Sequence, residues 1–241
     1  MLGKIISKLY LCAMSLTIEE KKRFYHSLVF PVFFLLLCWV IKISEIVLET
    51  NFVSFGVFPH KIKGLPGIIL SPLIHGDLSH IIANTIPLLT LSIGLFYFYN
   101  KISYKIFFLI YIITGIWVWF GAREAYHIGA SGIVYGLASF LFVSGVIRND
   151  MRLMTISLLV VFLYGGMIWG ILPIQDGVSW ESHLLGSVSG LVLAVIYRKE
   201  GPSKIKFDWE LEDENEDDKD YSNIICTYKD CDIQYLYDKE K

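Results

Sequence analysis

The sequence predicts an all-α membrane protein: a polytopic bundle of six transmembrane helices. Hydrophobic residues make up 54% of the 241 residues and charged residues only 18%. The mean hydropathy of +0.54 is far above that of a soluble domain of this length. Apolar runs of about 17–25 residues, the length that a helix needs to cross the hydrocarbon core, recur six times.

The six apolar runs lie at roughly 27–48, 78–99, 104–121, 131–147, 153–172 and 182–197. Residues 1–26 precede the first run and are expected to form an interfacial segment, because their short apolar stretch leads into charged residues and not into a cleavage site. The connection 49–77 is long enough to hold structure of its own, such as a hairpin partly submerged in the membrane. The membrane core is therefore expected at 27–199.

Positive charge is distributed unequally between the two sides of the predicted bundle. When the connections are assigned alternately, thirteen Lys and Arg residues fall on one side, and only Lys61, Lys63 and Arg123 on the other. Because Lys and Arg favour the cytoplasmic side, both termini are expected there.

The composition changes abruptly after the last run. Residues 208–220 carry nine carboxylates and one Lys, and like charges repel, so we expect 200–241 to be an acidic cytoplasmic tail without fixed structure. Cys226 and Cys231 have no histidine near them, so neither a metal nor another cofactor is expected. A net charge of −2 gives no indication of nucleic-acid binding.

Polar side chains are expensive to bury in a membrane, and four of those inside the apolar runs stand out: His80, Asn84, Ser131 and His183. A lone serine in a span usually bonds to its own helix, and a lone histidine or asparagine often bonds to a neighbouring helix. Counting about 1.5 Å per residue from the cytoplasmic charges, however, places Asn84, Ser131 and His183 at one level, just under the outer surface. His80 and Asn84 are four residues apart and share a helix face.

Small residues accompany the serine and the second histidine. Gly186 and Gly190 form a stripe that permits close helix packing, and Gly132 with Gly136 offers a matching one. Packing the two stripes together would bring Ser131 and His183 side by side. Such stripes also occur in ordinary tight helix pairs, so alone they are a weak signal.

A serine hydroxyl bonded to a neutral imidazole is an activated nucleophile. Ser131 would attack a carbonyl, and His183 would take the proton and return it to the leaving amine. His80, Asn84 and the Ser131 amide are candidates for the oxyanion hole. No acidic residue in the spans is well placed as a third triad member, so we expect Tyr135, one turn below Ser131, to pack against the His183 ring.

These residues resemble the rhomboid family of intramembrane serine proteases. The resemblance rests on three motifs: His75-Gly-Asp-Leu-Ser-His80-Ile-Ile-Ala-Asn84, Gly129-Ala-Ser131-Gly132-Ile-Val-Tyr135 and His183-x-x-Gly186-x-x-x-Gly190. It implies a six-helix rhomboid fold, a Ser131–His183 dyad, an oxyanion hole that includes His80 and Asn84, Tyr135 stacked on His183, and His75 near the water entry. It also implies a mobile fifth span through which a substrate helix docks.

The resemblance further implies that the partners are membrane lipids and single-span membrane proteins, cut near the outer ends of their helices. By analogy it favours a bacterial plasma membrane. The sequence gives no indication of the oligomeric state. The first long connection departs from the bacterial pattern, because Phe58-Pro-His-Lys-Ile-Lys63 replaces the usual Trp-Arg pair.

Two alternatives remain open. One is a catalytically inactive rhomboid-like scaffold that binds membrane proteins, although such relatives usually lack the serine or the histidine. The other is a small transporter or channel that uses its buried histidines as a proton or solute path. The sequence lacks the inverted repeat or paired broken helices typical of many transporters.

Overall fold

The computed structural model describes residues 2–163, 170–173, 177, 179–202, 224–228 and 231–235. The chain forms two compact units. One comprises Lys22–Pro202 and holds the helix bundle. The other comprises Met1–Lys21 with Ser203–Lys241, and each unit is described by itself.

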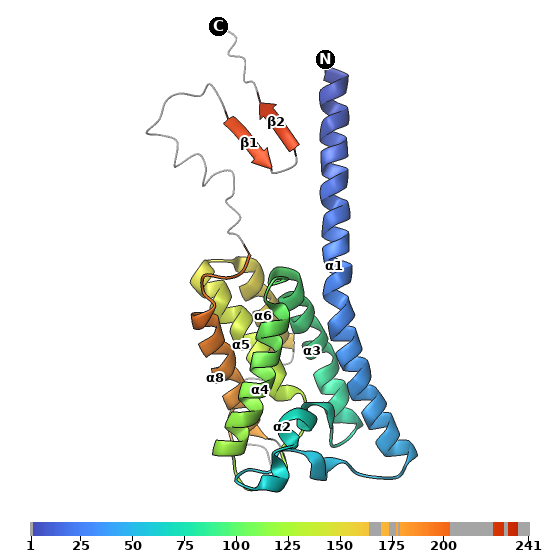
Figure 1. Ribbon diagram of the computed structural model, residues 1–241, viewed down its shortest axis with the longest axis vertical. Coiled ribbons are helices and arrows are strands. Elements are labelled where there is room, and N and C mark those ends of the chain that lie inside the picture. Colours follow the sequence, from blue (N-terminus) through green and yellow to red (C-terminus); the bar gives the residue numbers. More distant parts are fainter. Residues whose placement is uncertain are drawn as a thin grey trace. The chain divides into compact units, whose positions relative to one another are not determined.

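Among the described residues, six long or medium helices build the bundle (Figure 1). Four of them are long and apolar enough to cross a membrane: α1 (Leu2–Val47), α3 (Leu78–Phe98), α4 (Ser103–Gly121) and α5 (Ser131–Arg148). In α1 the apolar stretch is Ile18–Val47. The other two are shorter apolar helices, α6 (Met151–Leu163) and α8 (Trp180–Ile196).

The all-α polytopic fold is thus confirmed, and each predicted apolar run contains a helix. The count of six full-length spans is not fully confirmed. For the fifth run, predicted at 153–172, the structure describes α6 and then residues 170–173, and the remainder lies outside the described residues.

The connection 48–77 consists of several short helices and not of one hairpin. They are η1 (Val53–Phe55), η2 (Ile62–Gly64), α2 (Gly67–Leu70) and η3 (Ser71–Leu73). Short helices satisfy most of their backbone groups locally, which suits a segment at a membrane surface. The connection is tied to the bundle by a β-bridge between Val57 and His127.

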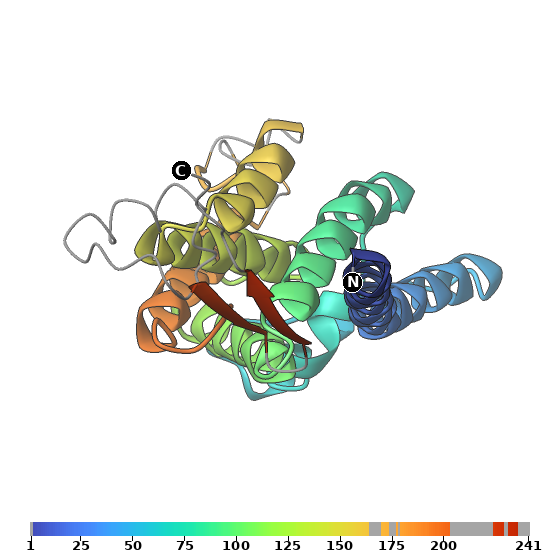
Figure 2. The same cartoon turned by 90° about the horizontal axis from the view of Figure 1, so that it is seen from above.

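Helix α5 lies at the centre of the bundle. It packs against α3, α4, α6 and α8 (Figure 2), and 67% of it is buried, against 28% for the spanning part of α1. Glycines allow α8 to approach it closely: a Cβ at Gly186 would lie 2.2 Å from the Gly132 carbonyl oxygen, and one at Gly190 would lie 2.0 Å from that of Gly136. The two predicted stripes therefore meet.

The tail contains two strands that the sequence analysis did not predict. In the second unit, β1 (Ile224–Tyr228) pairs antiparallel with β2 (Cys231–Tyr235). β1 consists mostly of Ile, Thr and Tyr, and β2 contains Ile and Tyr, which are residue types that favour extended backbone. Outside these ten residues, the expectation of a tail without fixed structure stays a prediction. The acidic run 208–220 lies outside the described residues.

Candidate active site

Ser131 is the first residue of α5, at the end of a segment held by backbone contacts. The Gly129 amide donates to the Ser71 carbonyl at 2.8 Å. Gly129 has φ +103°, and a Cβ there would lie 2.7 Å from two atoms of the His80 ring. Only glycine meets both conditions. The residues before the serine therefore run directly beside α3.

Ser131 and His183 are in contact. The Ser131 Oγ lies 2.8 Å from the His183 Nε2, and both side chains are more than nine-tenths buried. The serine comes from the start of α5 and the histidine from the first turn of α8, so the close packing of these two helices creates the pair.

The second nitrogen of His183 fixes the tautomer of the ring. Nδ1 lies 2.8 Å from the carbonyl oxygen of Gly170. A carbonyl can only accept, so Nδ1 carries the proton and, in the neutral imidazole, Nε2 presents its lone pair to the serine hydroxyl. This contact could not be predicted from the sequence, because every residue has a carbonyl.

Tyr135 stacks on His183. The ring centroids lie 4.3 Å apart, and the planes differ by 11°. This contact places the tyrosine where the sequence analysis expected it, one turn along α5 from Ser131. The imidazole is thus held by a hydrogen bond at its edge and by an aromatic ring on its face.

Residues before and at the start of α3 lie beside the segment that leads into Ser131. His75 Nε2 accepts a long hydrogen bond of 3.5 Å from the Ala130 amide, and the His75 and His80 rings meet edge to face at 5.0 Å. Asp77 caps α3 by accepting from the His80 amide at 2.8 Å. Asn84 Nδ2 donates within its own helix, to the His80 carbonyl at 3.2 Å.

A third buried histidine, His127, was not singled out from the sequence. Its Nε2 donates to the Arg123 carbonyl at 3.0 Å, and its Nδ1 accepts from the Ser179 hydroxyl at 2.5 Å. Ser179 also caps α8 by accepting from the Ser182 amide. His127 thereby ties the α4–α5 connection to the helix that carries His183. A histidine in a loop is a weak signal, because the sequence does not reveal its burial.

A small cavity of about 20 Å³ lies beside this arrangement. Its polar lining includes Ser71, Thr114, His127 and Ser182, and its wall includes Gly132, next to Ser131. This volume and these partners suit roughly one water molecule.

Burial keeps the side chains of His75 and His127 neutral. Desolvation, with the nearby His80 and Lys42, lowers the pKa of His75 to about 3. Desolvation also lowers the pKa of His127. Both rings can therefore serve as hydrogen-bond acceptors near neutral pH.

Glu181 and Glu45, two buried carboxylates, are paired with cations and do not contact His183. Glu181 lies 3.5 Å from the guanidinium of Arg123, and Glu45 pairs with Lys42 at 3.0 Å. Within the described part of the chain, no cluster of three or more His, Cys, Asp or Glu side chains could hold a metal ion. The arrangement is thus a Ser–His pair oriented by a backbone carbonyl and a tyrosine.

The four long apolar helices are those of an integral membrane protein. Residues 63–200 match the model of the Rhomboid domain. An uncharacterized protein of Mycobacterium tuberculosis is 37% identical over 155 residues, covering 58% of this chain and 62% of that protein. One of Mycobacterium leprae is 32% identical over 177 residues, covering 68% of each chain. The chain belongs to the rhomboid family.

The aligned region spans 62% of the length of the M. tuberculosis relative, and the same figure applies to a Mycobacterium bovis protein of equal identity. All of these relatives are described as uncharacterized.

Proposed function

We propose that this protein is an intramembrane serine endopeptidase that hydrolyses peptide bonds in or near the transmembrane helices of single-span membrane proteins. The observation that carries the proposal is the 2.8 Å contact between Ser131 Oγ and His183 Nε2. The Gly170 carbonyl supports it, because it holds the ring in the tautomer that accepts the serine proton.

In the first step the Ser131 oxygen attacks the carbonyl carbon of the scissile bond while its proton passes to His183 Nε2. The C–O bond forms, and the carbonyl oxygen becomes an oxyanion. The Ser131 amide at the start of α5 and the His80 and Asn84 side chains are proposed to donate to that oxygen. Asn84 would exchange its bond to the His80 carbonyl for one to the oxyanion.

The imidazolium then returns its proton to the leaving amine, and the C–N bond breaks. An acyl-enzyme on Ser131 remains. A water molecule attacks this ester, His183 accepts its proton and passes it back to the serine, and the second product leaves. The cavity of about 20 Å³ bounded in part by Gly132, which has Ser71, Thr114, His127 and Ser182 in its wall, is a nearby source of that water.

The proposed substrate class follows from the position of Ser131 and His183 at the ends of two apolar helices. A peptide bond inside a regular helix is shielded by its hydrogen bonds, so it must leave the helix before Ser131 can attack it. Helices that unwind easily near one membrane surface are therefore the proposed substrates.

The test uses purified protein with a labelled single-span substrate in detergent. Wild type should cleave it, and Ser131→Ala and His183→Ala should lose at least ~10³-fold in rate. Ser92→Ala removes another buried hydroxyl, on α3, and should retain the wild-type rate. Cleavage that survives both dyad substitutions would refute the proposal.

The inactive scaffold is the second candidate, since the comparisons establish the family and not the activity. A fluorophosphonate probe, which reacts with activated serine hydroxyls, separates the two. A protease should label in the wild type and not in Ser131→Ala. A scaffold should bind the substrate without labelling or cleavage.

We also propose that both termini face the cytoplasm of a bacterial cell, with the connection 48–77 outside. The distribution of Lys and Arg and the mycobacterial relatives support this. Single cysteines introduced at Lys61 and at Lys199 in a cysteine-free background provide the test. A membrane-impermeant maleimide applied to whole cells should label the first and not the second.

A further inference from the structure

A buried ion pair near the end of α1 stands outside the chemistry described so far. Lys42 is 8% exposed and Glu45 is 4% exposed. They lie in the last two turns of α1, which ends at Val47. Burying two charges in a spanning helix is costly, so such a pair calls for a structural or functional reason.

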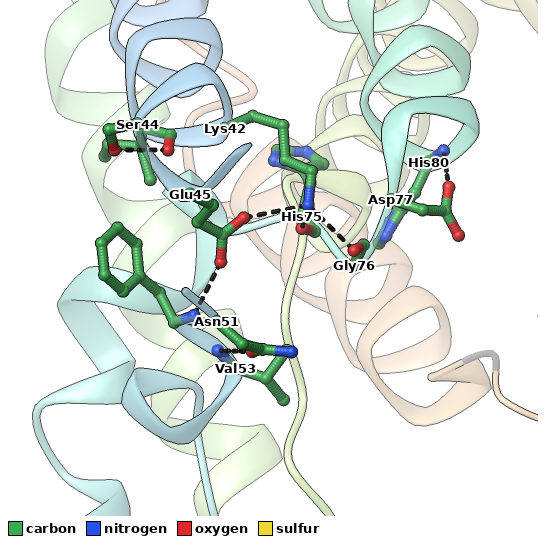
Figure 3. A network of polar contacts seen from close by, with 11 residues as sticks. Lys42, Ser44, Glu45, Asn51, Val53, His75, Gly76, Asp77 and His80 are labelled. Carbon is green, nitrogen blue, oxygen red and sulfur yellow. Dashed lines mark hydrogen bonds and ion pairs between the residues drawn. The ribbon is translucent and has the colours of Figure 1, made fainter. Parts of the chain in front are cut away.

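The lysine is bound by three oxygens (Figure 3). Its Nζ lies 3.0 Å from Glu45 Oε2, 3.0 Å from the His75 carbonyl oxygen and 2.9 Å from the Gly76 carbonyl oxygen. The other glutamate oxygen accepts from the Phe52 amide at 2.7 Å. The pair thus joins α1, the start of the first connection and the turn before α3.

The turn that Lys42 holds is the one that leads to the candidate oxyanion residues. Its His75 side chain accepts from the Ala130 amide, one residue before Ser131. Asp77 follows directly and caps the His80 amide. The His80 ring in turn lies against Gly129. Lys42 is therefore connected through a single residue, His75, to the segment that carries the serine.

We propose that Lys42, held by Glu45, is a positioning residue for the oxyanion hole, which keeps the 75–77 turn and thus His80 and Asn84 at the level of Ser131. This inference rests on the proposed protease function. Two of the three lysine contacts go to carbonyls of this turn, whereas an ion pair serving α1 alone would need only Glu45.

Removing the charges of Lys42 and Glu45 together separates an effect on the stability of the fold from an effect on the position of the 75–77 turn. Lys42→Met alone would leave Glu45 buried without a counter-charge and would destabilise the fold. Lys42→Met with Glu45→Gln leaves no buried charge and keeps an acceptor for the Phe52 amide, yet the two carbonyls lose their donor. Ser44→Ala is the matched control on the same helix, because the Ser44 hydroxyl donates only within α1, to Ile41.

The measurements are kcat and KM for the single-span substrate and the unfolding temperature in detergent. We expect the double variant to unfold within a few degrees of wild type, with kcat lowered about tenfold or more and KM within about twofold. Ser44→Ala should match wild type in all three. A folded double variant with wild-type kcat would overturn the inference.

If the double variant does not fold, the Lys42→Arg variant tests the positioning role instead. The planar guanidinium keeps the charge but cannot occupy the single point between the three oxygens. We expect wild-type unfolding with kcat lowered about threefold or more, and an unchanged kcat would overturn the inference. Absence of Ser131-dependent cleavage in wild type would overturn the proposed function and this inference together, whereas normal wild-type cleavage with unaffected Lys42 variants overturns the inference alone.

Discussion

Replacing Gly186 with alanine should disable the protein by moving α8 away from α5. A Cβ at Gly186 would lie 2.2 Å from the Gly132 carbonyl oxygen, and real Cβ contacts below 3.0 Å are essentially never seen. The helices must therefore separate by at least about 0.8 Å at this level. Gly132 follows Ser131, and Gly186 lies one turn from His183, so the same shift would act on the pair.

That shift is large enough to break the contact. A separation of 2.8 Å between Ser131 Oγ and His183 Nε2 would become about 3.6 Å, which is too long for a hydrogen bond. Misplacement of this size costs roughly 100-fold in kcat/KM. Overpacking costs about 1–3 kcal/mol, partly offset by the higher helix propensity of alanine, about 1 kcal/mol.

The assay compares Gly186→Ala with Gly121→Ala. Gly121 ends α4, and a Cβ there would have nothing within 4 Å, so the control makes the same chemical change without a clash. Cleavage rate and unfolding temperature are measured for both in the same detergent. We expect the control to resemble wild type and Gly186→Ala to unfold up to roughly 8 °C lower. Wild-type cleavage by Gly186→Ala would refute this account of the helix contact.

Two further predictions concern the rings around the site. Tyr135→Phe should keep more than about a third of the cleavage rate, because the ring stacked on His183 remains. Tyr135→Leu, which removes the ring, should lower the cleavage rate about tenfold or more. Equal cleavage rates in the two variants would contradict a role for stacking. Because the pKa of His75 is about 3 in the fold and about 6.5 when unfolded, the unfolded chain binds more protons between these values, and stability should fall as pH drops from 6.5 towards 3. His75→Gln should flatten part of that slope in unfolding temperature against pH, and an unchanged slope would contradict the assignment.

The fold could be predicted because it depends mainly on the length and hydropathy of the apolar runs. Bilayer-spanning helices require long apolar runs, and those runs are visible without any knowledge of packing. The common level of Ser131 and His183 followed from the fixed rise of a helix, and the glycine stripes indicated which two helices could approach. The roles of these residues in catalysis remain predictions.

Other parts of the site depend on the path of the connections, which leaves little trace in sequence. The acceptor for His183 Nδ1 is the carbonyl of Gly170, and the partners of Lys42 are the carbonyls of His75 and Gly76. Main-chain groups are the same at every position, so the path of the folded chain decides which of them are used. Lys42 was visible as a charge within a span, but nothing indicated that it reaches the turn before α3.

The Gly170 contact has a consequence for how fast the proposed chemistry can run. Soluble serine proteases place a full negative charge behind their histidine, whereas a carbonyl offers only a partial one. The cation formed on the ring during attack is then less well compensated. We expect a low turnover number, so that selectivity among membrane proteins would depend on how long each one stays unwound beside the serine.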